Sequence, residues 1–319
     1  WSLTLLQVLK IKIAQLILFL LLYLLFIGSL FSQDYYFEKY APFDENIKSP
    51  EEFLGYPIGE MQTRHDLIVS YMEYLSNVSD KAQILHYGET YEKRKLVILA
   101  ISSSDKILEL EKIRENHISY LNPEHPNYLE ESKPEDLPVI INLAYSVHGN
   151  EPSTSEAAML TAYTLVSSRT EVIKNYLENS IVLIDPVSNP DGRDRHTQWV
   201  NSYKASPLVD DPQDAEHNEY WPGGRVNHYW FDLNRDLLFG IHPETRGKLN
   251  FHHSWYPNVT MDFIEKYPHK PWDWAYISDN DNITIDFIER HIEKIKFSHL
   301  SQNLFTLQKK IDRIKKKVY

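Results

Sequence analysis

The sequence has no cysteine and no excess of basic residues, and each absence excludes a class of function. Without cysteine, neither disulfide bonds nor thiolate metal sites are possible. The formal net charge is −12, which argues against nucleic acid as the main partner, because phosphate binding needs a basic face. The chain has 319 residues, of which 42% are hydrophobic. This is enough material for one large α/β domain or two ordinary domains.

The N-terminal segment, residues 1–33, has the pattern of a secretory signal peptide. Lys10 and Lys12 precede an apolar stretch from Ile13 to Phe31, after which a polar region begins. A basic flank, an apolar core and a small residue before the break are typical of a cleaved signal. The stretch is also just long enough to span a bilayer, so an uncleaved anchor is the alternative. Either way we expect a secreted or periplasmic protein, which contacts a membrane only if this segment is retained.

Local patterns predict one helix and two strands after a lead-in segment, residues 34–62. Apolar residues at helical spacing predict an amphipathic helix over Thr63–Leu75. Two short runs, Ile84–Gly88 and Leu96–Ile101, predict strands joined by a turn.

The central part of the chain predicts a strand, a helix and a second strand. Val139–Ala144 and Ile181–Ile184 are continuous apolar runs, which indicate strands buried on both faces. Between them, Ser153–Val166 has an N-cap residue and an acidic first turn, as a helix requires. This order is a βαβ unit. The sequence therefore predicts an α/β fold with a mostly parallel mixed sheet flanked by helices.

A different pattern begins at residue 258. The segment Asn258–Glu265 recurs as Asn282–Glu289, with Pro271-Trp272-Asp273-Trp274 between the copies. A fixed period in the twenties indicates a helical array, and each copy has the features of a capped helix. The Pro-Trp-Asp-Trp segment also resembles tandem repeats of large DNA virus proteins. We therefore predict a short helical repeat and a basic tail over residues 258–319.

A histidine and a glutamate follow the predicted strand Val139–Ala144 at a spacing that suits a metal. His148 and Glu151 can hold one divalent ion if the strand delivers them into a turn, and catalytic zinc needs three protein ligands and a water. Ligands of parallel sheets bind beyond the carboxyl ends of strands, which is where these two residues fall. Taken alone, the pair is weak evidence, because a surface pair has the same spacing.

Two further motifs follow in order along the chain. Residues 189–192, Asn-Pro-Asp-Gly, end the second buried strand, and Arg225 precedes residues 232–235, Asp-Leu-Asn-Arg. Each motif has a plain structural alternative: the first is a good turn by composition, and Arg235 could form a surface ion pair with its neighbouring aspartates. Together with His148 and Glu151, however, this order resembles the zinc carboxypeptidase family over roughly Tyr56 to Asp262.

The resemblance implies a zinc cofactor and a role for each matched residue. His148 and Glu151 would be zinc ligands, and Arg225 would stabilise the oxyanion. Asn234 and Arg235 would bind the terminal carboxylate of a peptide or protein substrate. The implied reaction is hydrolysis of the C-terminal peptide bond by a zinc-activated water.

The sequence departs from the family at its third zinc ligand. The family has a histidine where this chain has Ile264, and its general-base glutamate has no clear counterpart among Glu265, Glu289 and Glu293, which belong to the repeat. A fusion at the start of the repeat would explain both departures. The alternative is a diverged enzyme that recruits another histidine as third ligand, with these candidates: His252, His253 and His269.

We therefore predict an incomplete carboxypeptidase-like domain over residues 63–257, with little or no activity. Two other functions stay open on the sequence alone. One is a deacylase or peptidoglycan amidase on the same scaffold, and the other is a non-catalytic interaction protein that uses the Trp-rich repeat.

Overall fold

The computed structural model describes residues 37–121, 124 and 137–263. They all belong to the first of two units into which the chain divides, residues 1–265 and 266–319. The predicted signal peptide and residues 264–319 of the predicted repeat lie outside the described residues. Within the described ranges, no helix is both long and apolar enough to cross a membrane.

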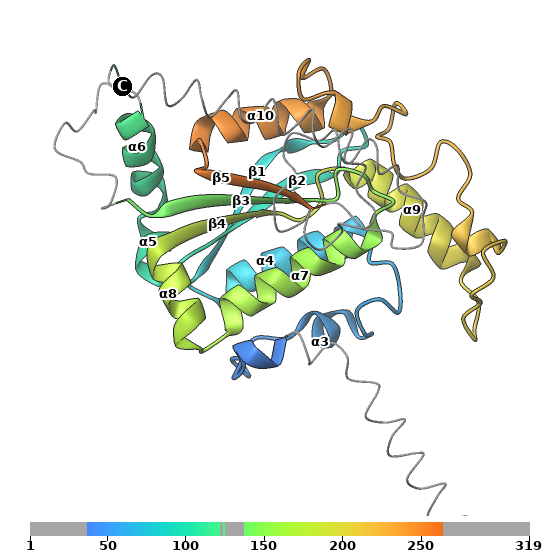
Figure 1. The fold of residues 1–319 in the computed structure, drawn as a ribbon, viewed down its shortest axis with the longest axis horizontal. Coiled ribbons are helices and arrows are strands. Elements are labelled where there is room, and N and C mark those ends of the chain that lie inside the picture. Colours follow the sequence, from blue (N-terminus) through green and yellow to red (C-terminus); the bar gives the residue numbers. More distant parts are fainter. Residues whose placement is uncertain (1–36, 122–123, 125–136, 264–319) are drawn as a thin grey trace, which may run out of the picture. The chain divides into compact units, whose positions relative to one another are not determined.

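A five-stranded mixed sheet forms the centre of the fold, with strand order β1-β2-β4-β3-β5 (Figure 1). β3 pairs in parallel with both β4 and β5, whereas β2 pairs antiparallel with β1 and β4. The predicted mixed sheet flanked by helices is confirmed. The strands are β1 (Ala82–Glu89), β2 (Lys95–Ile101), β3 (Val139–Tyr145), β4 (Ser180–Asp185) and β5 (Val259–Phe263).

Helices cover both faces of this sheet and enclose two apolar cores (Figure 1). Successive residues of β2 alternate between the cores: Leu99 and Ile101 pack with α4 and α7, while Ile98 and Ala100 pack with α6 and α10. This is the period-two alternation of a strand buried on both sides. The helices are α3 (Pro50–Leu54), α4 (His65–Val78), α5 (Ser104–Leu108), α6 (Leu110–Leu121), α7 (Pro152–Ser167), α8 (Glu171–Asn179), α9 (Pro190–Tyr203) and α10 (Pro243–Trp255), with short 3₁₀ turns η1 (Glu38–Tyr40), η3 (Ala215–His217) and η4 (Leu233–Arg235).

β5 occupies the place where the sequence predicts the first helix of the repeat. Val259–Phe263 is a strand in register with β3, with Asp262 opposite Ala144, so the helix prediction is wrong for these residues. Asn258 fixes the start of the strand, because its backbone and side chain exchange two hydrogen bonds of 2.8 Å with Ile140. The sheet therefore continues past the predicted boundary at residue 257.

A buried ion pair joins α7 to α9. Arg193 is fully buried, and its Nη2 lies 3.1 Å from Oε1 of Glu156. The same carboxylate accepts hydrogen bonds from the backbone and hydroxyl of Thr63, at 2.9 and 3.0 Å, and Arg193 Nε donates to the Thr63 carbonyl at 3.0 Å. The ion pair thus fixes the two helices and the residues just before α4 to one another.

We expect Glu156→Ala to lower the free energy of unfolding by about 3–5 kcal/mol, because it removes the carboxylate from a buried guanidinium. Urea denaturation followed by circular dichroism measures this. Glu171→Ala is the matched control, since that carboxylate is 88% exposed and 3.8 Å from Lys174, where ion pairs contribute little. A similar loss in the two variants would contradict the role assigned to the pair.

Candidate metal centre

The candidate site lies at the carboxyl ends of β3 and β4. These strands are parallel, so the loops that follow them meet at one edge of the sheet, where α7 and α9 begin (Figure 1). Two backbone hydrogen bonds join the loops: Ser188 N–H donates to the Tyr145 carbonyl at 2.9 Å and Asn189 N–H to the Ser146 carbonyl at 3.0 Å.

Two glycines allow these loops to cross in contact. A Cβ added to Gly149 would lie 2.1 Å from the backbone nitrogen of Arg193, and one on Gly192 would lie 2.4 Å from the Gly224 carbonyl oxygen. No side chain fits at either position. Only glycine is small enough at these two positions, because the segment that carries the candidate ligands lies directly against the first turn of α9.

His148 and Glu151 face one another in the turn between β3 and α7. Both are buried, and Nδ1 of His148 lies 3.0 Å from Oε1 of Glu151. Zinc bonds of about 2.0–2.2 Å in tetrahedral geometry would separate two ligand atoms by roughly 3.4 Å. The spacing of these two donor atoms therefore fits one zinc ion after a small adjustment.

Asp232 holds the other side of the His148 ring. Its Oδ1 lies 3.0 Å from His148 Nε2, and its Oδ2 accepts from Nη2 of Arg225 at 3.1 Å. Burial opposes the charge of Asp232, but His148 and Arg225 outweigh it and hold the carboxyl pKa below its ordinary value. A carboxylate on one ring nitrogen orients the imidazole and leaves the other nitrogen for a metal. This role was not predicted from the sequence, although Asp232 begins the Asp-Leu-Asn-Arg motif.

Asn234 and Arg235 lie on the short turn η4, which Asp232 caps by accepting from the Asn234 backbone N–H at 3.0 Å. Arg235 is exposed, and in the described ranges it forms no ion pair with Asp232 or Asp236. Asp236 instead accepts from the backbone N–H groups of Ile241 and His242 at 3.0 and 2.9 Å. The surface ion pair considered for Arg235 is thus not formed here, and its Nη1 instead donates to the Asn234 carbonyl at 3.2 Å.

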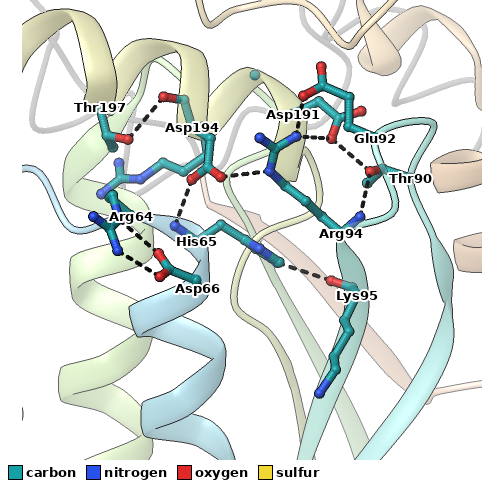
Figure 2. Close-up of polar contacts among 12 residues, drawn as sticks. Arg64, His65, Asp66, Thr90, Glu92, Arg94, Lys95, Asp191, Asp194 and Thr197 are labelled. Atoms are coloured by element: carbon teal, nitrogen blue, oxygen red, sulfur yellow. Dashed lines mark hydrogen bonds and ion pairs between the residues drawn. The ribbon is translucent and has the colours of Figure 1, made fainter.

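The Asn-Pro-Asp-Gly segment begins α9. Asn189 caps the helix by accepting from the Gly192 N–H at 3.1 Å, and its amide donates to the Arg225 carbonyl at 3.3 Å. Asp191 is turned toward the β1–β2 hairpin, where it accepts from Thr90 at 2.7 Å and from Arg94 at 2.8 Å (Figure 2). The segment therefore positions Arg225 and joins the hairpin to the site.

A second group of potential metal ligands surrounds the same hairpin. One donor atom each of Glu92, Asp191 and His228 lie within 4.8 Å of one another. The guanidinium of Arg94 lies between the two carboxylates and pairs with both (Figure 2). Arg94 therefore supplies the positive charge that neutralises these two carboxylates.

Two of the three substitute ligands proposed from the sequence lie in α10. His252 and His253 are in the last turn of α10, where their rings contact one another and Tyr256. Burial lowers the pKa of His252, and the nearby His253 adds to this. Among the described residues, no set of three ligands includes His148. Ile264 and His269 lie outside the described residues.

Glu244, at the start of α10, is a buried carboxylate beside the site. It lines a cavity of about 20 Å³ with Ser188, Asn234 and Lys248, which is room for about one water. Within the described part of the chain, neither of its oxygens meets a donor in good hydrogen-bond geometry, although the Asn227 side chain lies close enough to favour the charged form. Burial raises the pKa of Glu244 to about 7, and the charge of Asp191 adds to this.

One family model and several solved structures match this chain. The model of the zinc carboxypeptidase family matches residues 68–268. No curated protein matches the sequence. Among solved structures, a metallo-carboxypeptidase from Burkholderia cenocepacia is 13% identical, with 62% of this chain and 39% of that chain covered and a TM-score of 0.41.

Two further solved structures are similar to the same extent. A putative carboxypeptidase A from Shewanella denitrificans is 14% identical, with 68% of this chain and 46% of that chain covered and a TM-score of 0.41. The carboxypeptidase A from Helicoverpa armigera is 14% identical, with 75% and 53% covered and a TM-score of 0.42. The chain thus spans between 39% and 53% of the length of these three proteins.

We expect Asp232→Ala to weaken zinc binding about 10- to 100-fold, because the His148 ring loses the carboxylate that orients it. Competition with a chromogenic chelator measures the affinity. Asp66→Ala removes a surface carboxylate that pairs with Arg64 and controls for the loss of one negative charge. An unchanged affinity in Asp232→Ala would contradict the proposed support of the ring.

Glu244→Gln should stabilise the protein at neutral pH and not at acidic pH. The pKa rises from 4.5 to about 7 on folding, so both states are protonated below pH 4.5 and the penalty develops as pH rises toward 7. Above pH 7 the gain should be about 3 kcal/mol. Thermal unfolding between pH 4 and 8 measures it, with the exposed Glu178→Gln as control, and a gain independent of pH would contradict the assignment.

Proposed function

Because the chain belongs to the zinc carboxypeptidase family, we propose that it is an exported hydrolase of the metallocarboxypeptidase type, which acts on the C-terminal residues of peptides. The observation that carries the proposal is the continuous hydrogen-bonded path from Arg225 through Asp232 and His148 to Glu151. It links the candidate oxyanion group to the candidate metal ligands at the edge of the sheet. The apolar stretch and basic flank of residues 1–33 support export.

Each of the matched residues would have a separate role in such a reaction. A bound zinc ion would supply a water of lowered pKa and would polarise the scissile carbonyl. Arg225, about half exposed and held at 3.1 Å by Asp232, would place its guanidinium beside the developing oxyanion. Asn234 and Arg235 would bind the free carboxylate of the substrate, with Arg235 as a bidentate fork.

We propose further that the metal site of this chain is incomplete. Ile264 stands where the family has its third ligand, and isoleucine cannot coordinate a metal. The positions of His252 and His253 in the last turn of α10 offer no replacement. Two ligands should hold zinc weakly and position its water poorly, so little or no hydrolysis is expected.

Peptide binding tests the proposed substrate class without requiring turnover. A peptide with a free C-terminal carboxylate should bind about tenfold or more tightly than its amide, because it gains charge-assisted hydrogen bonds to Arg235. Arg235→Ala should remove this difference, and the exposed Arg246→Ala is the matched control. Titration calorimetry on the full chain measures both affinities.

Two results would contradict parts of the proposal separately. Equal affinity for the acid and the amide would argue against a carboxypeptidase and favour a deacylase or amidase on the same scaffold. One zinc per chain retained through extensive dialysis would instead contradict the incomplete site and indicate a third ligand.

A further inference from the structure

The loop that carries Arg225 exposes aromatic side chains to solvent. Trp221 and Trp230 are 75% and 57% exposed, although tryptophan is highly buried on average. Their ring centroids lie 4.9 Å apart with an interplanar angle of 59°, so they form an angled pair, called here the aromatic pair. Exposed apolar surface of this kind marks binding sites in soluble proteins.

The loop is built so that it holds this pair outward. Asn227 is fully buried and organises the following residues: its side-chain oxygen accepts from the backbone of Tyr229 and Phe231 at 3.0 and 3.1 Å, and its carbonyl accepts from Trp230 at 3.1 Å. Trp230 has a φ of 62°, a left-handed conformation that bulky residues rarely adopt. Such strain persists only where the surroundings enforce it, and it concentrates at functional sites.

The loop that carries the aromatic pair is anchored beside the candidate site. Gly224 packs between the loops, since a Cβ there would lie 2.6 Å from the Gly192 carbonyl and 3.3 Å from the backbone nitrogen of Asn150, which lies between His148 and Glu151. The guanidinium of Arg195 donates to the carbonyls of Gly223, Val226 and Asn227 at 2.9 to 3.2 Å. The loop is therefore held at both flanks of Arg225.

We propose that Trp221 and Trp230 bind an apolar or aromatic side chain on the residue just upstream of the scissile bond. The inference rests on the proposed function. Arg225 would bind the carbonyl oxygen of that upstream residue. The side chain of the same residue is attached to the carbon next to this carbonyl, so it would lie against the segments that flank Arg225. Those segments carry the aromatic pair. Two indole rings at an angle pack well against an aromatic side chain, and they provide no charged group to bind a charged side chain.

Two pairs of probe peptides test the proposal, and the members of each pair differ only at the upstream residue. The first pair is acetyl-Ala-Phe-Leu and acetyl-Ala-Ala-Leu. The second pair is acetyl-Ala-Phe-Lys and acetyl-Ala-Ala-Lys, and all four peptides have a free C-terminal carboxylate. Binding to the full chain is followed through the indole N–H signals of its seven tryptophans in nuclear magnetic resonance spectra. A chelator prevents cleavage. We expect the Phe peptides to bind about tenfold more tightly than the Ala peptides and to shift the signals of Trp221 and Trp230.

Variants separate the aromatic pair from general apolar binding. Trp221→Ala and Trp230→Ala should each remove most of the preference for Phe while leaving affinity for the Ala peptides unchanged, and Trp230→Phe should keep much of it. Tyr176→Ala is the matched control, because that side chain is 54% exposed on α8, which leads into the amino end of β4, whereas the candidate site lies at its carboxyl end. Melting temperatures verify that each variant is folded.

Four outcomes would overturn the inference. Equal binding of the Phe and Ala peptides, or a preference that survives both alanine variants, contradicts the aromatic subsite and leaves the proposed function intact. Indole shifts caused by N-acetylglucosamine oligomers and not by the peptides would assign the pair to a glycan. Failure of every peptide to bind contradicts the proposed function itself, and the inference with it.

Discussion

The arrangement of the candidate site depends on the buried ion pair between Arg193 and Glu156. Glu156 lies five residues after Glu151 in α7, and Arg193 lies four residues after Asn189 in α9. Each charge is tolerated inside the protein only because the other is there. The pair therefore holds the N-terminal ends of two helices in one relative position, and these ends follow the loops of β3 and β4. By also binding Thr63, it brings the residues just before α4 to the same place.

Residues that are not themselves ligands connect the two helices to the candidate metal ligands. Asn189 holds the carbonyl of Arg225, and Arg225 pairs with Asp232, which in turn orients His148. The candidate metal ligands are thus fixed by loops that arrive from three separate parts of the chain. Such outer contacts orient the ligands, and the loss of one typically lowers metal affinity about 10- to 100-fold.

The sequence predicted local features better than the contacts that join them. The apolar runs Val139–Ala144 and Ile181–Ile184 lie within β3 and β4, because a strand buried on both faces needs such a run. Residues 189–192 were predicted as a turn, but they begin α9, with Asn189 as N-cap and Pro190 in the first turn. Asp232 was overlooked because its partner His148 is 84 residues away. The strand β5 was predicted as a helix because its strand conformation depends on hydrogen bonds to Ile140, which lies 118 residues before Asn258.

The crossing of Gly149 and Arg193 gives the site an evolutionary constraint of a purely spatial kind. Any substitution at Gly149 pushes a carbon into the backbone of Arg193, and that backbone cannot yield while its guanidinium is clamped by Glu156. Natural variation at Gly149 should therefore be as rare as at the histidine before it. In a family alignment the two positions would look equally catalytic, although one is fixed by chemistry and the other by the lack of room for a single methyl group.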